Sequence, residues 1–163
     1  MDRRTFLGVS AAVLALTGCT GDPTGPVPPP MPPGAQDPDE TVRAEVAAAE
    51  IGLIGSYRDL IAREPARAAE LGPLLAHHEE HLALVAPGVQ APAPGVQAPT
   101  ASSAGAGTSL ADLVRAETAA VGQRTTACDG ALDAGLARDL CRIAASEAQH
   151  VDVLAAVLAA EAR

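Results

Sequence analysis

The chain has 163 residues, which is enough for one domain with flanking tails. It contains a single Tyr, a single Phe and no Trp, and 48% of its residues are hydrophobic, a composition that favours packed helices over sheets. Its formal net charge of −9 argues against a nucleic-acid-binding function, because no basic surface exists to displace counterions from phosphates.

The N-terminal residues 1–18 have the pattern of an export signal. Arg3 and Arg4 begin a stretch that resembles the twin-arginine signal, and a short apolar run follows it. The run ends at 16–19, Leu-Thr-Gly-Cys, which resembles a bacterial lipobox with Cys19 as the lipidated residue. We therefore expect a lipid anchor on the extracytoplasmic face of the cell membrane. A plain secretory signal with an incidental Cys is the alternative.

A Pro-rich segment over residues 19–36 follows the expected anchor. Consecutive prolines hold the backbone in the extended polyproline conformation, which suits a spacer between a membrane and a folded domain. We expect this segment to act as a tether.

The rest of the chain, residues 37–163, predicts an all-α domain. We expect helices at about 37–63, 65–85, 109–129 and 135–160. Asp37 is an expected N-cap with Pro38 in the first helical position, and Ser109 is an expected N-cap with Asp112 three residues later. Between the second and third helices, residues 86–108 contain a seven-residue unit twice and predict a long disordered connection.

Each predicted helix places ionisable side chains on or near its apolar face, at about 100° per residue. These side chains are Glu50, His78, His81, Glu117, Glu147 and His150. A Glu and a His three residues apart, as at Glu147 and His150, can converge on one ion or on each other. Arg124 lies close to the apolar face of the third helix, where it either pairs with one of the carboxylates or extends to solvent at the edge of the bundle.

This pattern resembles ferritin-like antiparallel four-helix bundles, and in particular actinobacterial lipoproteins of that type exported by the twin-arginine route. In that family the first and third helices each give a Glu, and the second and fourth each give Glu-x-x-His. Glu50, Glu117 and the pair of Glu147 and His150 fit this pattern, and His81 fits the His of the second helix. His78 departs from it, because it stands where a di-iron protein has its bridging Glu.

Three states of the inward cluster are open from the sequence. It binds one or two metal ions, with iron or manganese implied by the resemblance and zinc if imidazoles dominate; or it forms a metal-free ion-pair network; or it admits water. We expect a non-enzymatic bundle whose Glu/His network can bind metal, and a di-metal oxidase or metal-handling protein is the alternative. Expected partners are the membrane and either an envelope protein or further copies of the chain.

Two of the three cysteines predict a disulfide. Cys19 is assigned to lipid, whereas Cys128 and Cys141 lie at similar heights on two helices joined by a turn near residues 130–135. An exported protein is exposed to oxidising conditions, so we expect these two residues to be bonded, with two free buried thiols as the alternative.

Overall fold

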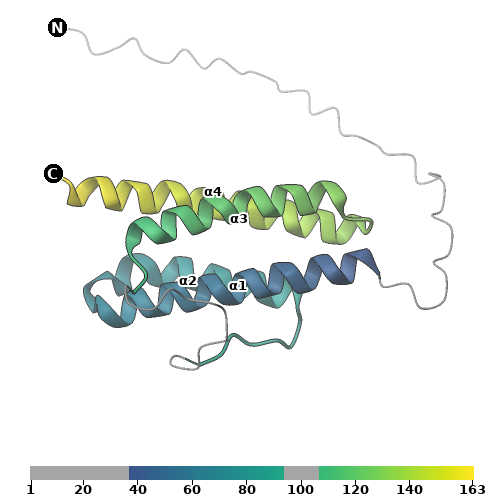
Figure 1. The fold of residues 1–163 in the computed structure, drawn as a ribbon, viewed down its shortest axis with the longest axis horizontal. Coiled ribbons are helices and arrows are strands. Elements are labelled where there is room, and N and C mark those ends of the chain that lie inside the picture. The colour runs from purple at the N-terminus through teal and green to yellow at the C-terminus, as the bar shows by residue number, and fades with distance from the viewer. Residues whose placement is uncertain (1–36, 94–106) are drawn as a thin grey trace, which may run out of the picture. The chain divides into compact units, whose positions relative to one another are not determined.

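The computed structural model describes residues 37–93 and 107–163. In these ranges it is all-helical and contains no strand (Figure 1). The helices are α1 (Pro38–Arg63), α2 (Ala68–Val85), α3 (Leu110–Gly130) and α4 (Ala134–Glu161), with a short 3-10 helix, η1 (Pro65–Arg67), between α1 and α2. The predicted export signal with Arg3 and Arg4, the lipidation site Cys19 and the tether 19–36 lie outside the described residues.

Local capping explains where α1, α3 and α4 begin. The side chain of Asp37 accepts a hydrogen bond from the backbone N–H of Asp39 at 3.0 Å, and Ser109 and Asp112 form a reciprocal capping box. The side chain of Asp133 caps α4 by accepting a hydrogen bond from the backbone N–H of Leu136 at 2.7 Å. α2 begins later than the sequence predicts, because Pro65–Arg67 forms the 3-10 turn first.

The four helices pack as a bundle of two pairs. α1 packs on α2 and α3 packs on α4, and the pairs meet where α1 faces α3 and α2 faces α4 (Figure 1). By length and composition α4 is also apolar enough to cross a membrane, but such a helix is commonly the core helix of a bundle. Here its buried face carries Glu147 and His150 into the core.

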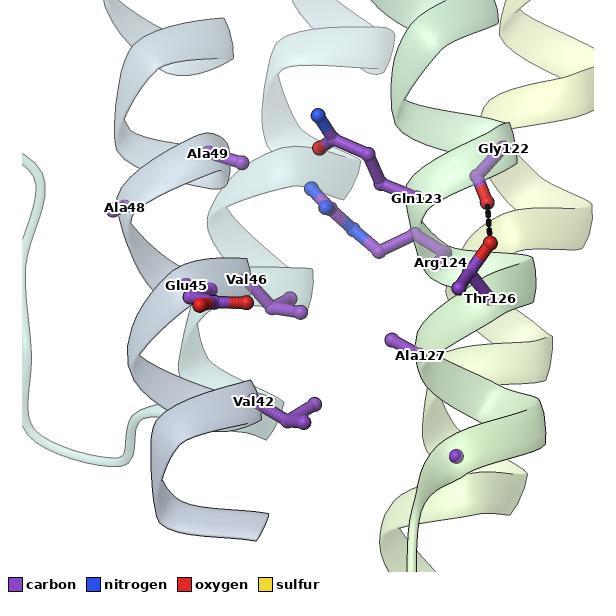
Figure 2. A pocket seen from close by; sticks show the side chains of 11 residues that line it. Val42, Glu45, Val46, Ala48, Ala49, Gly122, Gln123, Arg124, Thr126 and Ala127 are labelled. Carbon is purple, nitrogen blue, oxygen red and sulfur yellow. Dashed lines mark hydrogen bonds between the residues drawn. The ribbon is translucent and has the colours of Figure 1, made fainter. Parts of the chain in front are cut away.

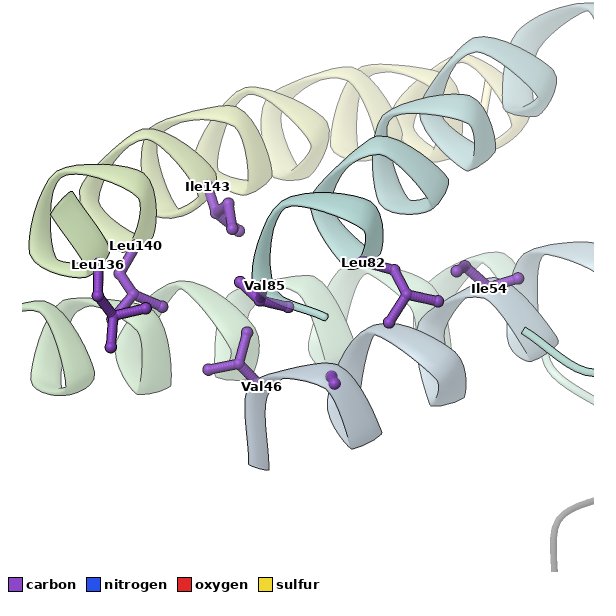
Figure 3. Close-up of a cluster of buried hydrophobic side chains, with 8 residues drawn as sticks. Val46, Ile54, Leu82, Val85, Leu136, Leu140 and Ile143 are labelled. Atoms are coloured by element: carbon purple, nitrogen blue, oxygen red, sulfur yellow. The ribbon is translucent and has the colours of Figure 1, made fainter. Parts of the chain in front are cut away.

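Two apolar clusters form the core. The first contains Val46, Ala47, Ile54, Leu82, Val85, Leu136, Leu140 and Ile143 (Figure 3). The second contains Tyr57, Leu60, Leu71, Leu74, Leu110, Leu113 and Leu154. Along α1 and α4 the first cluster precedes the second, and along α2 the order is reversed. On α3 the second cluster lies at the start, and Ala127 and Cys128 near the end pack against the first.

Two further contacts hold the turn between α3 and α4. Cys128 and Cys141 form a disulfide with Cα atoms 5.7 Å apart, which confirms the predicted pairing. Asp39 is 6% exposed, and its carboxylate accepts hydrogen bonds from the backbone N–H groups of Leu132 at 2.9 Å and Asp133 at 2.7 Å. The start of α1 is thereby joined to this turn.

The connection between α2 and α3 is more ordered at its ends than the predicted disordered loop over 86–108. Residues 86–93 include a turn at Gly88, which has a φ of 87°, and the carbonyl of Pro92 accepts a hydrogen bond from Arg58 at 2.7 Å. At the other end the N–H of Thr108 donates to Asp59 at 3.0 Å. Contacts with α1, which the local sequence does not reveal, therefore fix both ends; residues 94–106 lie outside the described residues.

Candidate metal centre

The structure brings all six predicted site residues together in the middle of the bundle. Their exposed fractions are 0% for Glu50, His78, Glu117 and Glu147, 2% for His150 and 7% for His81. Helix α1 contributes one of these side chains, α2 two, α3 one and α4 two. The helical periodicity of each segment alone was enough to predict this inward orientation.

His78 lies between two carboxylates. Its Nδ1 atom is 2.8 Å from Oε2 of Glu50, and its Nε2 atom is 2.7 Å from Oε1 of Glu117. Burial by itself would lower the pKa of His78, but the hydrogen bonds to Glu117 and Glu50 outweigh it and raise the pKa to about 9. In the metal-free protein His78 is therefore an imidazolium that donates to both helices.

Glu117 is the most heavily hydrogen-bonded carboxylate of the cluster. Its Oε1 atom accepts from the hydroxyl of Tyr57 at 2.5 Å and lies 3.3 Å from Nδ1 of His150. Burial would raise the pKa of Glu117, but the hydrogen bonds from His150, His78 and Tyr57 lower it to about 2. Burial beside this carboxylate also raises the pKa of Tyr57, so the phenol stays protonated.

Glu147 has the opposite environment. Neither of its buried carboxylate oxygens has a hydrogen-bond partner, and its nearest cation is Arg124, whose Nη2 atom is 3.4 Å from Oε1. Burial raises the pKa of Glu147 to about 8, and the negative neighbours Glu50 and Glu117 act in the same direction, against the opposing effect of Arg124. An ionised Glu147 is therefore short of positive partners.

Arg124 belongs to the cluster. Of the two alternatives that the sequence left open, it pairs with carboxylates and does not extend to solvent. It is 1% exposed, and its Nη2 atom donates to Oε1 of Glu50 at 3.2 Å. Figure 2 shows its side chain extending from α3 towards α1 along a groove of about 850 Å³. The walls of the groove are formed largely by small residues such as Ala49 and Gly122.

His81 of α2 lies beside Glu50 in the cluster. Its Nδ1 atom is buried without a hydrogen-bond partner and lies 3.8 Å from Oε1 of Glu50. Burial lowers the pKa of His81 to about 4, so its ring is neutral near pH 7. A neutral imidazole has a free lone pair on one ring nitrogen, which is the form that binds metal ions.

The donor atoms fall into two groups that share His78. Glu50, His78, His81 and Glu147 form the first group, and His78, Glu117 and His150 form the second. Within each group one ligand atom per residue lies within 4.8 Å of all the others. Side chains in either group can converge on an ion after small movements.

His77 also belongs to this region, although the sequence pattern did not predict it. Its helical position, roughly 100° from the centre of the apolar face of α2, predicts an exposed side chain, and it is exposed. Its Nδ1 atom nevertheless lies 3.0 Å from Nε2 of His150, so all four histidines of the chain gather between α2 and α4. The adjacency of α2 and α4 is a tertiary feature, and no local signal reveals it.

Comparison with known proteins does not identify a function or a bound metal for this chain. A scan against models of known protein families, a search of curated proteins and a search of solved structures each found nothing that matches this chain. The geometry of the cluster is therefore the basis for assigning a function.

Proposed function

We propose that this protein is a ferritin-like four-helix bundle, anchored by lipid outside the cytoplasmic membrane, that holds one divalent metal ion in its core. The ligands are Glu50, His78, His81 and Glu147. These four residues are the first donor group described above, and we call them the inner site.

The unpartnered atoms of the inner site carry the proposal. Both oxygens of Glu147 and Nδ1 of His81 are buried with no hydrogen-bond partner, and they belong to side chains whose donor atoms lie within 4.8 Å of those of Glu50 and His78. Buried polar atoms are rarely left unpaired, because each costs about 1–3 kcal/mol. A metal ion at this place would satisfy all three atoms at once.

The charges of the cluster fit a single divalent ion. In the metal-bound state the three buried carboxylates would carry a formal charge of −3, Arg124 +1 and the histidines none, so the ligand cluster without the ion would have a net charge of −2. One divalent cation neutralises this charge, whereas a second ion held among the same buried carboxylates would leave an excess of positive charge there. Arg124, in contact with Glu50 and Glu147, takes the electrostatic role of a second ion.

The donor set narrows the choice of metal. Two imidazoles and two carboxylates combine borderline nitrogen with hard oxygen donors, a set used for Fe²⁺, Mn²⁺ and Zn²⁺. Soft ions such as Cu(I) prefer sulfur, and the two Cys residues of the described chain are bonded to each other. We propose iron or manganese as the resident metal, in keeping with the ferritin-like resemblance.

The order of the apolar clusters supports the ferritin-like connectivity. It runs one way along α1 and α4 and the other way along α2 and α3, as expected if α1–α2 and α3–α4 are antiparallel hairpins. The end of α2 and the start of α3 then lie in different clusters, near opposite ends of the bundle, as do the helix ends that one long connection joins in ferritin-like folds.

The cellular location is supported by the N-terminal motifs and by the disulfide. Arg3, Arg4 and Cys19 match an export signal and a lipidation site, and the bond between Cys128 and Cys141 suits an oxidising compartment. Tethering by 19–36 would leave the bundle free to meet an envelope partner or further copies of the chain.

A metal-free structural network is the second candidate. The observation that favours it is the pair of hydrogen bonds from His78 to Glu50 and Glu117, at 2.8 and 2.7 Å, which already satisfy that ring without an ion. In this case the protonated His78 and Arg124 balance the charges of Glu50 and Glu117. The bundle would then serve as a scaffold.

Metal analysis separates the two candidates. Protein purified without chelator is expected to contain about one iron or manganese ion per chain, and Glu147→Gln, which keeps the shape of the side chain, is expected to lose it. Glu79→Gln, on an exposed residue of α2, is the matched control and should retain the metal. Metal-free protein whose melting temperature does not change on addition of either ion would refute the metal site in favour of the structural network.

A further inference from the structure

His77 and His150 lie against each other at the outer edge of the cluster. Their facing atoms, Nδ1 of His77 and Nε2 of His150, are 3.0 Å apart, and the two rings stack with centroids 5.3 Å apart. His77 is exposed, whereas His150 is only 2% exposed. The pair therefore connects solvent with the buried cluster.

Glu117 orients His150 for metal binding on its outer side. Nδ1 of His150 faces Oε1 of Glu117 at 3.3 Å, and because a carboxylate only accepts, this nitrogen carries the proton. The lone pair of the neutral ring then lies on Nε2, which faces His77. A histidine that binds a metal usually donates its other N–H to a carboxylate or carbonyl in this way.

The spacing of the two nitrogens is close to that of a bound pair. Imidazole nitrogens at about 2.0–2.1 Å from one tetrahedral ion are about 3.3 Å apart, and the observed separation is 3.0 Å. A small rotation of the exposed His77 ring supplies the difference. Oγ of Ser146 lies 3.4 Å from Nε2 of His150 and so places an oxygen near the same nitrogen.

The groove between α1 and α3 is a second approach to the cluster, and the charge of Arg124 in it repels cations. Arg124 lines this groove (Figure 2). Its Nη2 atom lies 3.2 Å from Oε1 of Glu50 and 3.4 Å from Oε1 of Glu147. A divalent ion entering there would meet a positive charge in a partly desolvated environment. On the side of α2 and α4 the rings of His77, which is exposed, and His150 lie between solvent and the buried cluster.

We propose that His77 and His150 form a second, solvent-facing site for a divalent transition metal, and that this outer site captures the ion that is passed to the inner site. The binding of an ion at the outer site is independent of the proposed function. The transfer of the ion to the inner site, by contrast, rests on the proposed function. The rings of His78 and His81, two ligands of the inner site, have centroids only 5.0 and 6.2 Å from that of His150 in the outer site.

A titration with Co²⁺, whose visible absorption reports its coordination, tests the outer site in the full-length exported protein. The wild type is expected to bind two Co²⁺ per chain. His77→Ala should bind one and retain the inner-site spectrum, and Glu147→Gln should bind one and retain the outer-site spectrum. Glu80→Gln, an exposed residue of α2, is the matched control and should bind two.

The outcomes distinguish this inference from the proposed function. Two ions bound by His77→Ala, or a single ion in the wild type that is lost only in Glu147→Gln, would overturn the outer site and leave the inner one standing. A single ion lost only in His77→Ala would support the outer site and refute the inner one. No ion bound by the wild type would refute both.

The rate of loading tests the transfer step. When metal-free protein is mixed rapidly with Co²⁺, the inner site of His77→Ala should fill several-fold more slowly than that of the wild type, with the same final occupancy. Equal filling rates for the two proteins would overturn the capture role of the outer site.

Discussion

The ring of His78 and the carboxylate of Glu50 are both fully buried and lie 2.8 Å apart, joining α2 to α1 in the middle of the bundle. A buried pair of this kind is costly to break, because the remaining partner keeps its charge without a counterion. The pair therefore links the stability of the bundle to the chemistry of its core.

Removal of Glu50 tests this link. Glu50→Ala leaves His78 and Arg124 without their shared carboxylate, and we expect a loss of about 3–5 kcal/mol in the free energy of unfolding. Glu45→Ala, an exposed residue of the same helix, should change it by no more than about 0.5 kcal/mol. Urea unfolding of the metal-free proteins measures both, and equal losses would contradict the prediction.

The metal-free protein should be most stable between about pH 4.5 and 6.5 and lose stability towards alkaline pH. The pKa of His78 is raised from 6.5 to about 9, so the folded state keeps a proton that the unfolded state releases, and stability falls from pH 6.5 through 9. The raised pKa of Glu147, from 4.5 to about 8, has the same sign, so stability also falls over that range.

On the acid side the signs reverse. The pKa of Glu117 is lowered from 4.5 to about 2, so the stability that this carboxylate contributes is lost as pH falls through that range. The pKa of His81 is lowered from 6.5 to about 4, so the unfolded state binds a proton more readily and the protein loses stability as pH falls from 6.5 to 4. Between pH 4.5 and 6.5 the effects of His81 and Glu147 oppose each other, which gives the plateau. Urea unfolding across this pH range provides the measurement, and a stability that rises from pH 6.5 to 9 would count against the network.

His78→Glu restores the carboxylate expected from the ferritin-like pattern. In the metal-free protein it removes a cation and adds a carboxylate beside Glu50 and Glu117, so we expect a strong loss of stability near neutral pH. Added Mn²⁺ or Fe²⁺ should recover much of this loss. Differential scanning calorimetry with and without metal measures the recovery, with His78→Gln as a neutral control that should recover less.

The disulfide between Cys128 and Cys141 should contribute modestly to stability. It closes a short loop, with a sequence separation of 13, so replacing both cysteines by Ser is expected to cost about 3 kcal/mol at most. Because the bond lies near the α3–α4 turn, metal content should not change. A variant that loses its metal along with the bond would show that the turn and the cluster are coupled more closely than this.

The sequence by itself determined the helices and the inward set of side chains. A 3.6-residue period of apolar residues and N-caps such as Asp37 and Ser109 are local signals, and they were enough to place Glu50, Glu117 and Glu147 on buried faces. The pairing of Cys128 with Cys141 also followed, because a short turn constrains both ends.

Only the tertiary structure decided how these side chains are paired. The contact of His77 with His150 and the contacts of Arg124 with Glu50 and Glu147 depend on which helices are neighbours. The partners of Asp39 also depend on helix packing. The sequence places Asp39 at the start of the first helix, and in the structure its carboxylate binds the α3–α4 turn. Periodicity gives the direction of a side chain relative to its own helix axis, whereas its partner is set by the packing of separate helices.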